Sequence, residues 1–169
     1  MIELLILYSL KHRERTLYSL RSDITEKFGY ITKPSIGTIH PAVKRLLKDN
    51  VVTVRNTFSD GGKKSTFYTL ALHWQKRFHD LFFTPLSDNP TQLFTEIQVR
   101  LAVMSLLDKD LKETFIEDIL LKLESFKLDS ENTKDDEYIK LDYYQTALLQ
   151  RNISEVDSLI NFIKNLEIK

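Results

Sequence analysis

The sequence feature that most constrains the fold is one predicted β-hairpin in a chain whose other patterns are helical. Residues 51–58 (VVTVRNTF) are rich in β-branched side chains, and residues 65–72 (STFYTLAL) form a second run of strand type. Asp60, Gly61 and Gly62 between them are a strong hairpin turn signal. Because a two-stranded hairpin is marginally stable alone, we expect one of its faces to lie on neighbouring helices.

Three helical patterns precede this hairpin. Residues 2–11 are apolar nearly throughout and predict a buried helix, and residues 17–28 carry a narrow apolar stripe that Gly29 ends. Ser35 is a good N-cap for a third helix, which runs to residues 49–50, and the residue before Pro34 avoids helical angles. A fourth helix is predicted after the hairpin, over residues 73–83.

The order helix, helix, helix, hairpin is that of a winged helix-turn-helix. In this fold the third helix enters the DNA major groove, and the wing reaches a neighbouring backbone or minor groove. The apolar side of the third helix would hold it on the first two helices, through Ile36, Ile39, Val43, Leu46 and Leu47. Its outer side would contact DNA and carries, after Ser35 at the helix start, Thr38, His40, Lys44 and Lys48.

Each of these DNA-contacting candidates has a plainer alternative. Thr38 and Lys44 can reach base edges or phosphates, and His40 can bond a base or only phosphate and water. Lys63 and Lys64 lie just past the predicted turn. They either contact phosphates or are solvated turn residues, and the basic balance around them favours phosphate contact.

Pro41 departs from a regular helical pattern. It lacks the amide that would bond the carbonyl of Gly37, which costs up to roughly 3 kcal/mol in a long regular helix. Two interpretations are open. Either Gly37 and Pro41 form a loosened first turn that brings the backbone close to DNA, or Pro41 starts the helix, which then begins near His40.

The charge of the chain is zero overall but unevenly distributed. Residues 1–80 hold 14 Lys and Arg against 7 Asp and Glu, a balance of +7, and the remaining residues hold 10 against 17, a balance of −7. This division is expected when only the first half approaches a polyanion, although charge also fluctuates by chance along any sequence.

Other classes of protein fit the sequence poorly. The absence of cysteine excludes disulfides, a thiolate nucleophile and a Cys-based zinc site, and favours a reducing cytoplasm. The start of the chain lacks a signal-peptide layout, and no stretch is long enough to span a membrane. We expect no catalytic residues, cofactor or metal, because known catalytic motifs are missing and the four histidines are scattered: His12, His40, His73 and His79.

A loop over residues 84–91 (TPLSDNPT) marks the predicted domain boundary, with one domain at 1–84 and another at 91–169. Residues 92–107, 111–128 and 138–166 are long helical patterns, and the last keeps near-heptad spacing. The acidic residues 129–137 predict a loop or solvated helix ends. One subunit could bury these apolar faces on itself, but pairing of two subunits explains them better.

The segment IGTIHPAVKRLLKDNVV, followed by a glycine-basic turn and STFYTL, resembles the signature of the PadR family of transcriptional regulators. The resemblance spans roughly residues 1–75, which covers the predicted winged helix-turn-helix. It departs at His40, where the family usually has tyrosine, and at Leu17, where the family usually has glycine.

The resemblance implies a dimeric, usually repressing, DNA-binding protein whose C-terminal helices pair two subunits. It implies that Tyr18 meets the DNA backbone; without the resemblance, Tyr18 is an ordinary half-buried ring. Relatives often respond to small aromatic compounds in or near the dimer interface. Trp74 and Phe78 could line such an effector pocket, although aromatic residues at helical spacing more often belong to a core.

The sequence therefore predicts a mainly α protein with a small β-hairpin, an N-terminal winged helix-turn-helix and a C-terminal α-helical dimerisation domain. The predicted function is a cytoplasmic transcriptional regulator, a repressor that binds double-stranded DNA as a homodimer. Two-fold symmetry predicts a palindromic operator with half-sites roughly 34 Å apart. The alternative is a winged-helix protein-interaction module without specific DNA binding, whose acidic helices contact a basic partner.

Overall fold

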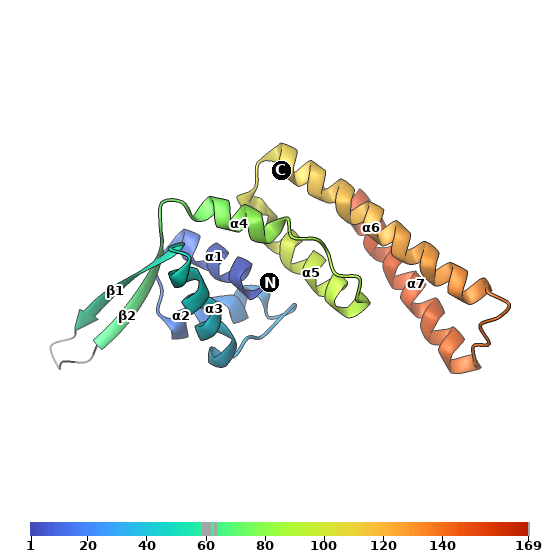
Figure 1. The fold of residues 1–169 in the computed structure, drawn as a ribbon, viewed down its shortest axis with the longest axis horizontal. Helices are drawn as coiled ribbons and strands as arrows, with labels where there is room; N and C mark the ends of the chain where they lie inside the picture. Colours follow the sequence, from blue (N-terminus) through green and yellow to red (C-terminus); the bar gives the residue numbers. More distant parts are fainter. Residues whose placement is uncertain (59–61, 63, 169) are drawn as a thin grey trace. The chain divides into compact units, whose positions relative to one another are not determined.

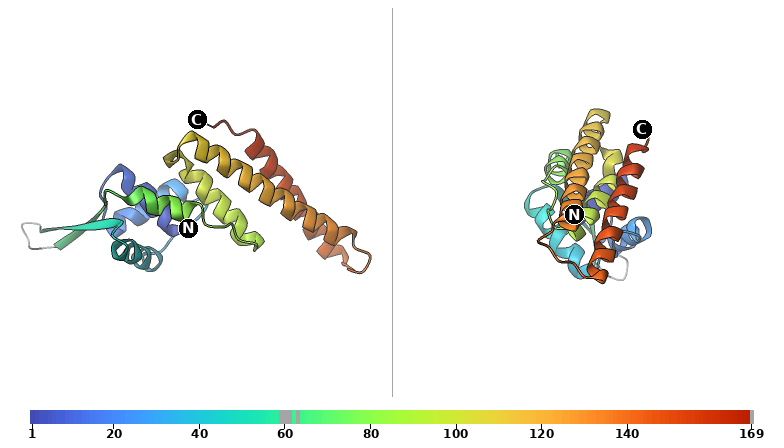
Figure 2. Two further views of the ribbon diagram at one scale, coloured as in Figure 1. Left: turned by 45° about the horizontal axis from the view of Figure 1, so that its top comes forward. Right: turned by 90° about the vertical axis from the view of Figure 1, so that its right-hand side faces the viewer.

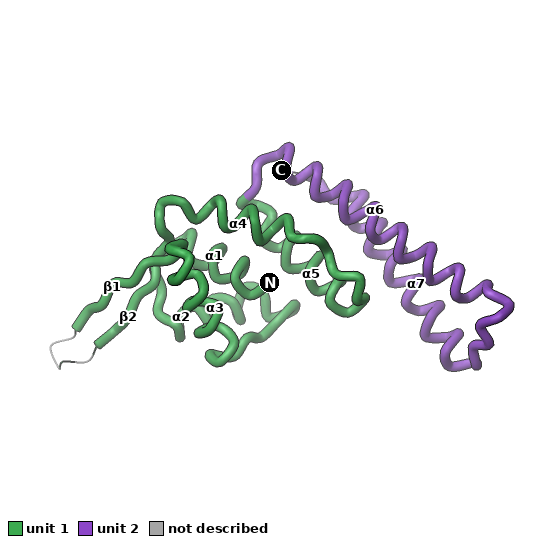
Figure 3. The backbone as a smooth tube through the Cα atoms, in the orientation of Figure 1, with its two compact units in different colours: residues 1–106 green, residues 107–169 purple. Residues whose placement is uncertain are grey.

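The computed structural model describes residues 1–58, 62 and 64–168. The described elements, in chain order, are α1 (Ile2–His12), α2 (Leu17–Phe28), α3 (Ile36–Lys48), β1 (Val52–Phe58), β2 (Lys64–Leu70), α4 (Trp74–Phe82), α5 (Pro90–Val103), the 3₁₀ turn η1 (Met104–Leu106), α6 (Lys109–Asp135) and α7 (Tyr143–Lys164) (Figure 1). They form two compact units, Met1–Leu106 and Leu107–Lys169 (Figure 3). The predicted fold, mainly helical with a winged helix-turn-helix, is confirmed.

Helix α1 is the central helix of the first unit. It contacts α2, α3, α4, α5 and β2. Its apolar side chains are almost fully buried: Leu4, Leu5, Ile6, Leu7 and Leu10. A helix that is apolar on nearly all sides is stable in water only when other elements surround it, and the sequence prediction of a buried helix here is confirmed.

Helix α2 begins and ends for local reasons. Thr16 is its N-cap, and its hydroxyl accepts from the amide of Ser19 at 3.2 Å while the Ser19 hydroxyl accepts from the amide of Thr16 at 2.8 Å. Gly29 ends the helix as predicted, with an ordinary φ of −63°. Glycine is needed there because a Cβ atom would lie 2.4 Å from the carbonyl oxygen of Thr25.

Helix α3 begins at Ile36, directly after the predicted N-cap Ser35. Pro41 therefore lies inside the helix, and the alternative start near His40 is wrong. The end of the helix is closed by Asn50, whose φ of 56° is left-handed and whose amide donates to the Leu47 carbonyl at 3.0 Å. Asparagine tolerates this conformation at helix ends, which turns the chain directly into β1.

The hairpin pairs β1 and β2 in antiparallel register, from Val52 opposite Leu70 to Phe58 opposite Lys64. It extends away from the helices of the first unit (Figure 1). At its base, the loop between α1 and α2 joins it through two backbone hydrogen bonds between Arg15 and Tyr68, of 3.0 and 2.8 Å. The predicted hairpin is confirmed, and a segment before α2 extends its sheet by one bridge.

Helices α4 and α5 both pack on α1. Helix α5 buries Leu93, Ile97, Val99 and Val103, so it belongs to the first compact unit. The units therefore divide after residue 106, whereas the sequence places the domain boundary near residues 85–90. The domain limits 1–84 and 91–169 stay a prediction about which segments act as separate functional domains.

The second unit is a hairpin of two long helices, α6 and α7, which run side by side in Figures 1 and 2. Each helix turns a row of buried residues inward: Phe115, Ile119 and Leu123 on α6, and Ile153, Val156, Ile160 and Ile163 on α7. Ion pairs cross between them, among them Lys127 to Asp157 at 2.7 Å and Lys164 to Glu124 at 3.0 Å.

The ends of these two helices differ from the sequence patterns. Residues 129–135 continue α6, so of the two alternatives for the acidic residues 129–137, a loop or solvated helix ends, the helix end is found over 129–135. Helix α7 starts at Tyr143 because Asp142 caps it: its carboxylate accepts from the amide of Gln145 at 2.8 Å. Within the described residues, no helix combines the length and apolar character that crossing a bilayer requires.

Candidate nucleic-acid interface

The outer face of α3 is the candidate DNA-binding surface. Ile39, Ala42, Val43 and Leu46 are fully buried on its inner face. The exposed residues of the helix are Gly37, Thr38, Pro41, Lys44, Arg45 and Lys48. Thr38 and Lys44 are thus exposed on the helix, as an interface with DNA requires, whereas His40 is half-buried and offers less of its ring to a partner.

The start of α3 is fixed by a small hydrogen-bond cluster. The Ser35 hydroxyl accepts from the amide of Thr38 at 3.2 Å, and the two side-chain oxygens lie 3.1 Å apart. This cap orients the first turn and satisfies a backbone donor that would otherwise lack a partner. Ser35 is exposed, so its hydroxyl can also contact a phosphate, but in this structure it caps α3.

Several exposed cations of α2, α3 and the turn between them carry no ion pair within the described residues. They are Arg21 on α2, Lys44 and Lys48 on α3, and Lys33 in the turn between the two helices. Sequence reasoning missed Arg21, which follows Tyr18 by three residues and so shares its face of α2. Tyr18 itself is 76% exposed, so it is free to meet a phosphate and is not the half-buried ring of the alternative interpretation. The spacing of Tyr18 and Arg21 was the available signal.

Arg45 differs from the other α3 cations because it is held by the protein. Its Nε donates to the Glu3 carboxylate at 2.6 Å, and Arg77 of α4 lies 3.4 Å from the other oxygen of Glu3. Arg77 also lies 3.4 Å from Asp49 at the end of α3. The buried Glu3 therefore ties the second half of α3 to α1 and α4, and we expect Arg45 to position the helix more than it attracts phosphate.

Another ion-pair cluster joins α1, the loop after it and α2. The buried Asp23 of α2 accepts from Arg15 at 2.6 Å and from the Ser9 hydroxyl, and Lys27 lies 3.1 Å away. Burial acts to raise the pKa of Asp23, but the hydrogen bonds of Ser9 and Lys27 and the charge of Arg15 outweigh it and hold the pKa below its usual value. The carboxylate therefore stays ionised and binds α1, α2 and their connecting loop together.

The wing supplies two candidate cations, of which one is described. Lys64 is exposed at the start of β2, opposite Phe58, and Lys63 lies outside the described residues. Arg55 of β1 is occupied: its Nε donates to Glu14 at 3.1 Å, and its guanidinium lies 5.2 Å from the ring centre of Phe67. Lys64 is therefore the described wing residue best placed for a phosphate contact.

The predicted effector residues Trp74 and Phe78 are neighbours in the core of the first unit. Their ring centres lie 5.9 Å apart, and the residues are 8% and 1% exposed. Trp74 also borders a polar cavity of about 400 Å³ beside Lys11 and His12, which Phe78 does not line. The effector pocket stays a prediction. Among the described residues, no group of three His, Asp or Glu side chains is placed to hold a metal ion.

Of the comparisons with known proteins, only the one with solved structures found similar chains. No family model matches this chain, and no curated protein does. It is similar to Bacillus subtilis PadR in complex with operator DNA, with 17% identity over 97% of this chain and 96% of the other, at a TM-score of 0.47. A PadR family transcription regulator from Clostridium difficile is 21% identical over 47% of this chain and 81% of its own, with a TM-score of 0.41.

A PadR-like transcriptional regulator from Bacillus cereus is 22% identical over 47% of this chain and 75% of its own, with a TM-score of 0.40. At these identities and TM-scores the similarities carry no argument about function, which rests on the geometry of this chain. These three solved structures, to which the chain is similar, are of PadR or PadR-like regulators, and the motif at residues 36–70 resembles the same family.

Proposed function

We propose that this protein is a sequence-specific, DNA-binding transcriptional regulator that acts as a homodimer. The observation that carries the proposal is the two-sided character of α3. Its apolar face is sealed on α1 and α2, and its outer face presents Thr38, Lys44 and Lys48. A capped, exposed, cationic helix beside a projecting hairpin suits a DNA duplex, because the major groove admits one helix and the wing reaches the adjoining backbone.

We expect two kinds of contact on this surface, one with phosphates and one with base edges. Lys44, Lys48 and Lys64 carry mobile ammonium groups that neutralise phosphates, which gives affinity and salt dependence. Thr38, in the first turn of α3, is short and rigidly placed by its cap, and a hydroxyl in that position suits a base edge or a nearby phosphate. Tyr18 and Arg21, on the exposed side of α2, are placed for the backbone next to the groove.

The second unit supports the homodimer part of the proposal. Large apolar side chains are exposed on α6, on α7 and on the segment between them: Leu121, Leu128, Tyr138, Ile139, Tyr143, Tyr144, Leu148 and Phe162. A two-helix hairpin has few means of covering such surface by itself, and a second copy of the chain would bury it. We retain residues 91–169 as the dimerisation domain and 1–84 as the DNA-binding domain.

A two-fold dimer would bring two α3 helices to one duplex and select a palindromic operator. A regulator of this kind acts where the chromosome is, so the proposal includes a cytoplasmic location. We propose repression, since a dimer bound across a promoter blocks access to it, and release by a small aromatic effector remains part of the hypothesis. The alternative, a winged-helix module that binds a protein partner, predicts no sequence-selective DNA binding.

Selection of bound sequences from a random duplex pool tests the proposal directly. We expect an enriched palindrome with half-sites about one helical turn apart. Lys44→Ala should weaken binding to the selected duplex and reduce the slope of log K against log salt by about 0.9 for each phosphate that Lys44 neutralises. Lys76→Ala, which changes another exposed lysine, this one on α4, is the matched control and should leave that slope unchanged. A pool without enrichment, or salt-indifferent binding, would favour the protein-interaction alternative.

A further inference from the structure

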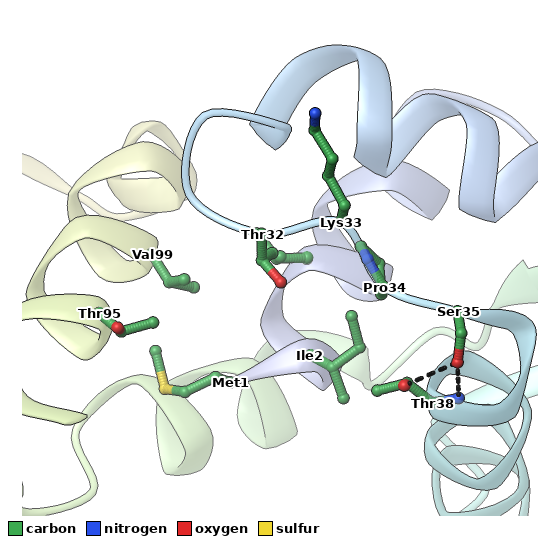
Figure 4. Close-up of a pocket in the computed structure, with 10 residues that line it drawn as sticks. Met1, Ile2, Thr32, Lys33, Pro34, Ser35, Thr38, Thr95 and Val99 are labelled. Carbon is green, nitrogen blue, oxygen red and sulfur yellow. Dashed lines mark hydrogen bonds between the residues drawn. The ribbon is translucent and has the colours of Figure 1, made fainter. Parts of the chain in front are cut away.

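A cavity of about 400 Å³ lies at the start of α3, on the side facing α1 and α5 (Figure 4). Three parts of the first unit meet there: the beginning of α1, the turn between α2 and α3 with the first turn of α3, and the middle of α5. The residues that line it are Met1, Ile2, Leu5, Thr32, Lys33, Pro34, Ser35, Thr38, Thr95 and Val99. Its size is within the range of ordinary small-molecule sites.

The lining is apolar with a few hydroxyl groups. Ile2, Leu5 and Val99 supply carbon surface, and the hydroxyl of Thr32 makes no side-chain hydrogen bond within the described residues. Lys33 is the one lining side chain with a charge, and its ammonium points away from Ile2 and Thr38 in Figure 4, so that only its stem borders the cavity. Met1, which also lines the cavity, carries the α-amino group, and burial lowers its pKa and so favours its neutral form. An ion would lose part of its hydration here, so the lining suits an uncharged molecule.

The cavity shares residues with the DNA-binding surface. Ser35 and Thr38 line it, and their hydrogen bonds to each other are the cap of α3. A hydroxyl or carbonyl group bound between them and Thr32 would compete for those bonds. The first turn of α3, which is proposed to enter the groove, would then be held differently when the cavity is filled.

We propose that this cavity binds a small uncharged molecule, with a compact apolar body and one hydroxyl or carbonyl group, and that its occupancy weakens DNA binding. The regulatory half of this proposal rests on the proposed function, whereas the binding half does not. If the bound molecule and DNA exclude each other, a ligand at ten times its dissociation constant raises the apparent dissociation constant for DNA about elevenfold.

The test uses three probes that share an adamantyl group and differ in their polar group, which is neutral, anionic or cationic: 1-adamantanemethanol, 1-adamantanecarboxylate and 1-adamantanemethylamine. Calorimetry on the full chain without DNA measures binding of each probe, and a DNA titration measures the consequence. Thr95→Phe fills the cavity from α5, away from the outer face of α3. Thr91→Phe places the same ring one turn earlier on α5, outside the cavity, and is the matched control.

We expect saturable binding of the alcohol, at least tenfold weaker binding of the two ions, and a loss of alcohol binding in Thr95→Phe but not in Thr91→Phe. The alcohol should raise the DNA dissociation constant of the wild type and the control, and leave that of Thr95→Phe unchanged. Equal binding of the three probes, or unaltered binding to Thr95→Phe, overturns the site. Binding that leaves DNA affinity unchanged overturns the regulation, and failure of every variant to bind DNA without probe overturns the proposed function.

Discussion

Replacing Asp23 by asparagine tests whether its buried carboxylate holds the helix-turn-helix together. The side chain of Asp23 is 8% exposed and that of its partner Arg15 is 5% exposed, with 2.6 Å between the charged atoms. Removing one member of a buried ion pair costs about 3–5 kcal/mol, because the other charge stays buried without compensation. Arg15 keeps its bond to the Ser9 carbonyl at 3.2 Å, so we expect the low end of that range, about 3 kcal/mol.

Urea denaturation followed by circular dichroism at neutral pH measures this loss. Asp80→Asn, the same chemical change at an exposed position of α4, is the control and should stay within about 0.5 kcal/mol of the wild type. If Asp23→Asn were as stable as Asp80→Asn, the carboxylate would contribute nothing net. The account of α1, α2 and their loop as one ionic cluster would then be refuted.

The same variant has a defined pH signature. The pKa of Asp23 is lowered in the folded protein, so its contribution to stability is present above the unfolded pKa of about 3.9 and is lost as the pH falls through the folded value. The stability difference between wild type and Asp23→Asn should therefore be constant near neutral pH and shrink below about pH 4. A difference that stays constant into strong acid would contradict the ionic explanation.

Three further changes follow from the geometry. Gly29→Ala should destabilise the protein by about 1–3 kcal/mol in denaturant titration, because the new Cβ would meet the Thr25 carbonyl oxygen at 2.4 Å. Pro41→Ala should raise stability by up to about 3 kcal/mol, since it restores the backbone hydrogen bond from the amide of residue 41 to the Gly37 carbonyl inside α3. An unchanged denaturation midpoint would count against this. Leu148→Glu, at a 60% exposed position of α7, should shift sedimentation toward the monomer without lowering helicity.

The fold was largely predictable because its signals are local. Ser35 marks the start of α3 through its own side-chain bond, and Gly29 marks the end of α2 through a steric approach within one helical turn. The hairpin follows from strand-forming runs around a glycine turn. Such features depend on neighbours within a few residues, so one sequence contains the information.

The parts that were not predicted depend on tertiary partners. Helix α5 has the same apolar pattern whether it packs on α1 or on α6, so the division of the chain after residue 106 left no local trace. The neutralisation of Arg45 by Glu3 joins residues 42 positions apart, and no pattern in α3 shows it. For the candidate site, exposure of Thr38 and Lys44 was foreseeable from helical periodicity. Arg21 was missed although its spacing from Tyr18 was a usable signal, and the structure adds that both residues are exposed.

Among the described residues, the bridge between Arg15 and Tyr68 anchors the wing, the hairpin of β1 and β2, at one end only. Both backbone groups of Tyr68 are bonded to Arg15, and Arg55 on the next rung bonds to Glu14. Within the described residues, the outer rung of Thr57 and Ser65 has no such bond to the loop before α2. The wing is thus attached to the first unit at its base, through the loop between α1 and α2. Substitutions near Tyr68 would change the angle between the hairpin and the helices, and substitutions near Ser65 would change the stiffness of its outer part. The two properties of the wing can therefore vary independently.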